Sequence, residues 1–144
     1  MTTFVVALFL LFQACSSSTS VEEEEHADAE GLTLTVNGVE IVRVEEGAAT
    51  GEITVEAGEE TALITLRFLD HDGDEFQPTD EEFALDVAIG DESIAEFEQH
   101  DEDGKWAFHI HGEAAGSTEA TFSLLHGDHA DFESAPVTIT VTAP

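Results

Sequence analysis

The sequence predicts an all-β protein, an antiparallel β-sandwich that follows a disordered N-terminal segment. From Leu32 onward, apolar and polar residues alternate with a period of two, which is typical of strands with one buried face. The alternating stretches are short, and turn residues separate them along the chain. Many short strands without a convincing helical pattern favour two packed sheets.

Each expected element follows from this alternation and from the turn residues between strands. Asn37-Gly38 predicts a type I′ hairpin turn. Asp72-Gly73 and residues 101–104 mark further turns, and Pro78 breaks a loop. The expected strands are residues 32–36, 39–44, 53–55, 62–69, 83–89, 94–97, 105–111, 118–125 and 137–141.

Several of these stretches also resemble a known family. Residues 93–97 and 106–111 are followed by an Ala-Gly-Ser-Thr turn at 115–118, a strand at 120–124 and a terminal Val-Thr-Ile-Thr-Val strand. In this order they resemble a bacterial immunoglobulin-like domain of the invasin and intimin type, over roughly residues 50–142. The resemblance implies an immunoglobulin-like sandwich, which we assign to residues 31–144. It implies no specific function, because such sandwiches serve adhesion, binding and spacing alike.

The N-terminal residues resemble a bacterial lipoprotein signal peptide. An apolar run at 4–12 precedes Cys15, the only cysteine, and a serine-rich stretch and an acidic run at 22–25 follow it. The run is too short for a spanning helix, which needs roughly 20 apolar residues, so a processed export signal fits better. The resemblance implies a signal peptide at 1–14, lipid on Cys15 and an exported protein anchored to the outer membrane or cell surface. The alternative is a plain secretory signal with an incidental cysteine.

The composition limits what the exported chain can bind. It has 33 Asp and Glu against 3 Lys and Arg, a formal net charge of −30. Nucleic acid and anionic lipid surfaces are therefore poor partners, because their phosphates need Lys and Arg. The acidic residues are spread from Glu22 to Glu133, which favours a halophile's salt-adapted composition over a dedicated cation-binding surface. Residues 15–30 have little to bury and predict a disordered acidic tether.

Histidines on the expected strand 105–111 predict a metal site. Trp106, Phe108 and Ile110 share one face, which we assign to the core, so His109 and His111 share the outer face. Side chains at i and i+2 on one face stand about 7 Å apart, within reach of one metal ion.

The turn at 101–104 suggests a register with the preceding strand. His100 would face Lys105, and Phe97 would face Phe108 on the buried side. Glu98 would then lie opposite Ala107, Glu96 opposite His109 and Ile94 opposite His111. The outer face would display His100, His109, His111, Glu96 and Glu98 together, a donor set that suits Zn²⁺, Cu²⁺ or Ni²⁺.

A second histidine cluster lies in the hairpin before the last strand. His126 and His129 flank Gly127-Asp128, and Asp128 adds a carboxylate that could help to wrap one ion. Whether the two clusters form one site or two stays open at this point. His26 falls in the tether, and we expect it to be inert.

A calcium loop is also suggested at residues 70–74, but less well. Asp70, Asp72 and Asp74 match the first three ligand positions of an EF-hand, and Glu81 matches the twelfth. However, Glu75 stands where the glycine is needed, and no helices flank the loop. A turn between strands is the better interpretation, so calcium is not expected.

The sequence therefore supports two functional hypotheses. The first is a cell-envelope lipoprotein that binds a transition-metal ion, for capture, buffering or delivery to an envelope receptor or transporter. The second is a structural or adhesive surface module with no metal role. We do not expect an enzyme, because the chain has no Tyr and its one Cys lies in the export segment. It also has no Ser in a nucleophile-elbow pattern and no Gly-rich phosphate loop that opens a helix.

Overall fold

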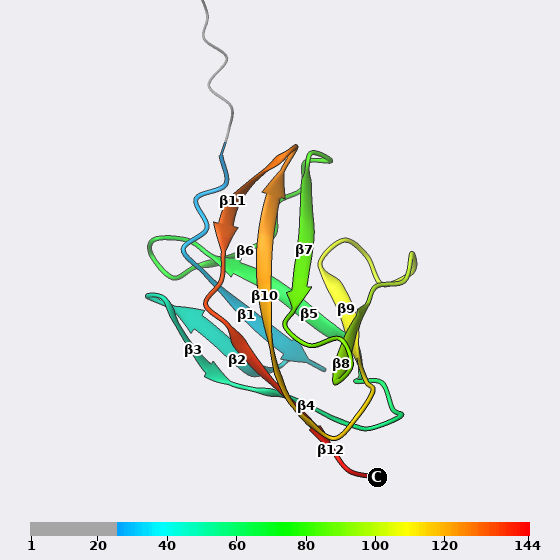
Figure 1. Cartoon of the computed structure of the whole chain (residues 1–144). Helices are drawn as coiled ribbons and strands as arrows, with labels where there is room; N and C mark the ends of the chain where they lie inside the picture. Colours follow the sequence, from blue (N-terminus) through cyan, green and yellow to red (C-terminus); the bar gives the residue numbers. More distant parts are fainter. Residues whose placement is uncertain (1–25) are drawn as a thin grey trace, which may run out of the picture.

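The computed structural model describes residues 26–144, and these residues form twelve β-strands and no helix (Figure 1). In chain order the strands are β1 (Gly31–Val36), β2 (Val39–Glu45), β3 (Ala48–Gly51), β4 (Ile53–Glu56), β5 (Ile64–Leu69), β6 (Glu75–Phe76), β7 (Phe83–Ile89), β8 (Ala95–Glu98), β9 (Ala107–Gly112), β10 (Gly116–His126), β11 (His129–Glu133) and β12 (Val137–Thr142). The predicted all-β class is confirmed.

The strands form two sheets with immunoglobulin-like connectivity. One sheet has the order β3-β2-β1-β5-β9-β8, with the short β6 also paired to β5. The other contains β11-β10-β12-β4, with β7 paired to β10. The sub-orders β1-β5-β9-β8 and β7-β10-β12 match the two sheets of an immunoglobulin domain. The β2–β3 hairpin is an addition to that pattern, and β4 pairs with β12 in parallel, so the sandwich is not purely antiparallel.

The core lies between the two sheets and follows the predicted alternation. Phe68 and Phe108 from one sheet and Phe122 from the other are fully buried, and the Phe108 and Phe122 rings are 5.5 Å apart. Trp106 closes the core near the β6–β7 loop, where its indole Nε1–H donates to the carbonyl of Pro78 at 3.0 Å. Aromatic rings from distant strands therefore hold the sheets together.

The structure confirms the expected turn at Asn37-Gly38 and contains strands that were not predicted. Asn37 and Gly38 both have positive φ, 50° and 78°, as a type I′ turn requires. Glu46 and Gly47 form a second such turn, with φ of 51° and 76°. The strand β3 that follows it was missed, because its Ala-Ala-Thr-Gly sequence contains no large apolar residue.

The predicted register between residues 94–100 and 105–111 is wrong by two positions. Glu98 pairs with His109 and Glu96 pairs with His111, whereas we expected Ala107 and His109 as their partners. Phe97 pairs with Ile110 rather than Phe108. The physical reason is the connection, which runs from the end of β8 at Glu98 to the start of β9 at Ala107 and is longer than a four-residue turn. Because the shift is even, each side chain keeps its predicted face.

The expected end of the tether is also corrected. Residues 26–30 pack on the sandwich: Ala27 and Ala29 contact the core, and the Glu30 amide donates to the Leu69 carbonyl at 2.8 Å. Their small side chains and backbone donors find partners on β5 and β11, a placement that composition alone could not reveal. The signal segment at 1–14 and Cys15 lie outside the described residues. Within the described part of the chain, no helix is long and apolar enough to span a membrane.

Candidate metal centres

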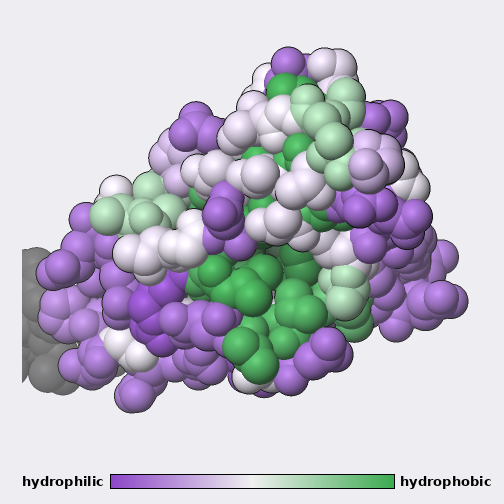
Figure 2. All heavy atoms as spheres, turned by 90° about the horizontal axis from the view of Figure 1, so that it is seen from below, coloured by the Kyte–Doolittle hydropathy of each residue, from purple (hydrophilic) through white to green (hydrophobic). Residues whose placement is uncertain are grey.

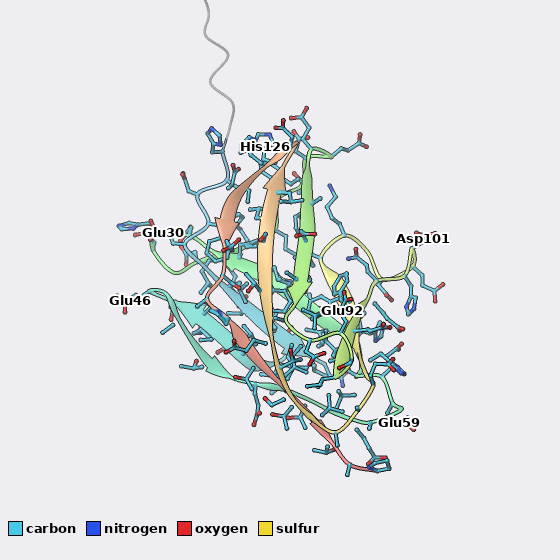
Figure 3. The ribbon with its side chains drawn as sticks, in the orientation of Figure 1. Glu30, Glu46, Glu59, Glu92, Asp101 and His126 are labelled. Carbon is cyan, nitrogen blue, oxygen red and sulfur yellow. The ribbon has the colours of Figure 1, made fainter. Side chains whose placement is uncertain are left out.

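The structure gathers the histidines into two main groups at different places on the sandwich. Figure 3 shows His126 at the tip of the β10–β11 hairpin and Asp101, within the β8–β9 loop, at the side of the molecule. We call the first group the hairpin cluster: His26, His126, His129 and Asp131. We call the second group the loop cluster: His100, Asp103 and His109. In each cluster the potential ligand atoms all lie within 4.8 Å of one another.

The hairpin cluster is built around the carboxylate of Asp131. The Asp131 Oδ1 atom lies 2.9 Å from Nδ1 of His26 and 3.1 Å from Nε2 of His129. The Oδ2 atom lies 3.6 Å from Nδ1 of His126 and accepts a hydrogen bond from the Ala27 amide at 3.1 Å. The three imidazole centroids are 5.4 to 6.0 Å apart. Three imidazoles thus surround one carboxylate.

The strand pairing explains why these side chains meet. His126 and His129 are direct cross-strand partners at the end of the hairpin, so their side chains are neighbours. The register between β10 and β11 then slips, because Leu125 pairs with Ala130 and Leu124 with Phe132. Asp131 is the extra residue of this β-bulge, and bulges of this kind re-aim a side chain.

His126 is the most constrained member of the hairpin cluster. The residue is only 9% exposed, and its ring stacks on Phe83 with centroids 4.5 Å apart. Its Nε2 lies 3.3 Å from the carboxylate of Glu82, which can only accept, so a proton on Nε2 is needed to form this hydrogen bond. The buried Nδ1 has no hydrogen-bond partner. In the tautomer that has its proton on Nε2, the Nδ1 lone pair faces the Asp131 carboxylate across 3.6 Å.

The Asp131 side chain is only 3% exposed, yet its environment favours the charged form. Burial is the largest single influence on the pKa of Asp131 and raises it. The hydrogen bonds from the His26 ring and the Ala27 amide, together with the charges that His26 and His126 carry when protonated, outweigh burial and lower the pKa of Asp131 below its ordinary value. The cluster therefore holds an anionic oxygen beneath three imidazoles.

The loop cluster arises where the β8–β9 loop folds back on β9. The Asp103 Oδ2 atom lies 3.1 Å from Nδ1 of His100 and accepts the His100 amide at 2.9 Å. The Oδ1 atom lies 3.6 Å from Nε2 of His109, and the two imidazole rings are 5.4 Å apart. The His109 Nδ1 donates to the Thr61 carbonyl at 2.9 Å and lies 3.2 Å from Glu60. Thr61 therefore fixes the orientation of the His109 ring.

Two pKa shifts mark the strong negative field around the loop cluster. Burial is the largest influence on the pKa of His109 and lowers it, but the Thr61 carbonyl, Glu60 and Asp103 together raise the pKa above its ordinary value. The pKa of Glu98 is raised, chiefly because its carboxyl group shares a hydrogen bond with Glu60. Glu60 and Glu98 also form a third donor group with His100.

The predicted parity of β9 is confirmed, and only one of the two outer histidines, His109, belongs to a donor group. Phe108 and Ile110 are fully buried, while His109 and His111 are half-buried on the opposite face. His109 turns towards Asp103, whereas the His111 Nε2 lies 3.4 Å from Glu113. Neither His111 nor Glu96 belongs to a donor group among the described residues.

The residues of the second predicted cluster are partly corrected. His126 and His129 do come together, but Asp128 is a fully exposed residue at the turn, 3.5 Å from His129, and lies outside the group. Asp131 takes its place, which the i, i+2 spacing from His129 on a strand could have indicated. The sequence carries no signal for His26, which lies 105 residues from Asp131.

The aspartate-rich segment at 70–74 forms a turn. The Asp70 Oδ1 atom accepts the amides of Asp72 and Asp74, both at 2.9 Å. The Asp70 amide donates to the Asp74 carbonyl at 3.0 Å. These hydrogen bonds close the connection between β5 and β6, in line with the turn interpretation.

Comparison with known proteins adds little to this picture. No protein-family model matches the chain, and no curated protein matches it. Among solved structures, the chain is similar to the crystal structure of the S-layer protein SbsC domains 4 and 5, at 17% sequence identity and a TM-score of 0.45. The similarity covers 78% of this chain and 54% of that one, so the match spans about half of its length. Neither a family nor a function follows from a similarity of this size.

Proposed function

We propose that this protein binds a transition-metal ion, Zn²⁺ or Cu²⁺, at the hairpin cluster. The observation that carries the proposal is the buried Nδ1 of His126, which has no hydrogen-bond partner and lies 3.6 Å from the Asp131 carboxylate. With the ring proton on Nε2, the Nδ1 lone pair and the anionic oxygen face each other in a buried place, and a cation between them would satisfy both. Metal-ligating histidines commonly have the other ring nitrogen held by a carboxylate, as Glu82 holds that of His126.

The donor set supports the same proposal. Imidazole nitrogens with one carboxylate oxygen suit zinc in a four-coordinate site, and they also suit copper. An open pocket beside the hairpin gives an ion a route to the donors; it is lined by Pro78, Asp80, Phe83, His126 and His129, among others. A site with four protein donors leaves no free position for substrate, so it favours holding an ion over catalysis.

The loop cluster is a weaker candidate for the same role. Among the described residues, only His126 has a buried side-chain nitrogen without a hydrogen-bond partner, so the loop cluster lacks the observation that carries the proposal. The two clusters form separate donor groups, so a composite site is not proposed.

The proposed cellular role extends the sequence analysis. The chain would be exported, anchored through lipid on Cys15, and would capture, buffer or deliver its ion to an envelope receptor or transporter. The support is the apolar run, the lone cysteine and the serine-rich stretch at the N-terminus. The mass of the N-terminal peptide of the exported protein tests the lipid anchor. A mass that shows an unmodified Cys15 would contradict the proposed anchoring.

Titration calorimetry of the full chain with Zn²⁺ and Cu²⁺ tests metal binding. The buffer should contain about 1 M NaCl, where the screening length is about 3 Å and non-specific binding to the acidic surface is suppressed. We expect one saturable site, and His129→Asn should weaken it about tenfold or more because a ligand is lost. His129 is partly exposed, so this change should leave the fold intact.

Two matched controls make the titration specific. His71→Asn changes an exposed imidazole that pairs with Glu30 outside both clusters, and it should leave the affinity unchanged. His100→Asn should also leave it unchanged if the ion occupies the hairpin cluster. If no saturable binding occurs in high salt, or if His71→Asn weakens binding as much as His129→Asn, the proposal is wrong.

A second candidate function, a structural or adhesive surface module, is favoured by a different observation. Figure 2 shows the end of the sandwich opposite the β10–β11 turn, where hydrophobic residues gather in one patch bordered by hydrophilic ones. Patches of this kind often mark interaction surfaces. This alternative predicts a melting temperature that is insensitive to EDTA and to added Zn²⁺, whereas the metal-binding proposal predicts that Zn²⁺ raises it.

A further inference from the structure

The hairpin cluster is completed by a residue from outside the sandwich. His126, His129 and Asp131 all come from the β10–β11 hairpin, whereas His26 precedes β1. In Figure 1 residues 26–30 run down beside β11. The hairpin alone therefore offers two imidazoles and one carboxylate, and residues 26–30 bring the third imidazole.

Contacts with Asp131 contribute to the docking of residues 26–30. The His26 ring and the Ala27 amide both donate to the Asp131 carboxylate, at 2.9 and 3.1 Å. Other contacts of the segment include the small side chains of Ala27 and Ala29 on the core, the backbone bond from Glu30 to Leu69 and the pairing of Glu30 with His71. Two methyl groups bury little apolar surface, so polar contacts, those at Asp131 among them, decide whether the segment stays docked.

We propose that His26 is a ligand of the ion, so that metal binding and docking of residues 26–30 are one coupled event. This inference rests on the proposed metal-binding function. An ion held by His126, His129 and Asp131 would take His26 as its fourth donor, at the place where that ring now meets Asp131. The coupling is reciprocal: docking tightens metal binding, and metal binding tightens docking by the same factor.

The coupling has a consequence for an anchored chain. If Cys15 carries lipid, residues 26–30 are the part of the tether that joins the domain. An ion bound through His26 then fixes the point at which the tether leaves the sandwich. Loss of the ion would free that point and increase the range of orientations that the domain can adopt relative to its anchor.

Amide hydrogen exchange of the full chain, with and without Zn²⁺, tests the coupling. In the native sequence we expect Zn²⁺ to slow exchange in peptides that contain residues 27–30, including the Ala27 amide that donates to Asp131. In His26→Asn the slowing should disappear, and the Zn²⁺ affinity should fall about tenfold or more because one donor is missing. The His26 side chain is more than half exposed, so the substitution should leave the sandwich folded, which a cooperative thermal melt of the metal-free variant checks.

His71→Asn is the matched control for this experiment. His71 contacts Glu30 in the same segment but supplies no atom to the hairpin cluster, so this variant should keep both the affinity and the slowed exchange. If Zn²⁺ binds with the His129 dependence described above but His26→Asn changes neither affinity nor exchange, the coupling is wrong and the proposed function stands. If the native chain does not bind Zn²⁺ in high salt, both fall together.

Discussion

At the scale of single residues, the environment of each imidazole determines its chemistry more than its position in the sequence does. His126 and His109 each have one ring nitrogen held by an oxygen acceptor and the other facing a carboxylate at 3.6 Å. His126 is nearly buried and its Nδ1 has no hydrogen-bond partner, whereas His109 lies beside two carboxylates, Glu60 and Asp103, that favour its protonation. The same residue type thus has a buried ring nitrogen without a hydrogen-bond partner in one place, which is where we propose a metal ion, and an environment that favours protonation in the other.

The raised pKa of His109 predicts a pH-dependent contribution to stability. Because the folded-state pKa lies above the unfolded value, protonated His109 stabilises the fold at pH values below the ordinary histidine pKa. This contribution is lost as the pH rises through the raised pKa of the folded state. An NMR titration of the His109 ring should give a midpoint above that of an unstructured histidine.

The Glu60→Gln variant should lower the midpoint of the His109 titration, because it removes one of the negative charges that raise the pKa. The Glu52→Gln variant removes an exposed carboxylate that hydrogen-bonds to Thr140 and should leave the midpoint unchanged. A His109 midpoint at or below the ordinary value in the native chain would contradict this account.

At the scale of elements, the connections between strands determine where the two histidine clusters lie and how the sheets are joined. The β10–β11 hairpin brings His126 and His129 together, and its bulge adds Asp131. The β3–β4 corner, where the chain passes from one sheet to the other, depends on Gly51. This glycine has a φ of 84°, and a Cβ atom there would collide with the carbonyl oxygen of Ile41.

We predict that Gly51→Ala destabilises the protein more than Gly47→Ala. Both glycines have positive φ, which costs an L-residue about 1–2 kcal/mol. A side chain at Gly47 would meet open space, so its variant should lose only that amount. Gly51→Ala should lose more free energy of unfolding, because the backbone around Ile41 must also move. Urea denaturation measures both, and equal losses would contradict the predicted steric contact.

Secondary structure was largely predictable at this scale, whereas pairing was not. The parity of β9 follows from Trp106, Phe108 and Ile110, because a period of two separates the two faces of a strand. The register of β8 against β9 does not follow from parity, since a shift of two residues keeps every side chain on its face. The length of the β8–β9 loop decided the register, and with it the partners of His109.

At the scale of the whole molecule, the net charge of −30 opposes the compact state through self-repulsion. We predict that the melting temperature rises steeply with NaCl, because the screening length falls from about 10 Å at 0.1 M to about 3 Å at 1 M. The melts should be recorded with EDTA in every sample, so that metal binding does not contribute. A melting temperature independent of NaCl would count against the salt-adapted interpretation of the composition.

The sequence by itself determined the class of the fold, the buried faces of most strands and the residue types of the proposed metal donors. These properties depend on local alternation and on turn residues, which lie next to one another along the chain. Only the tertiary structure decided which donors meet. His26 reaches Asp131 across 105 residues, and Asp103 rather than His111 joins His109, because sheet register and loop length bring these side chains together. Contacts between segments that are distant in the sequence depend on how the sandwich packs, and the local alternation of apolar and polar residues does not predict them.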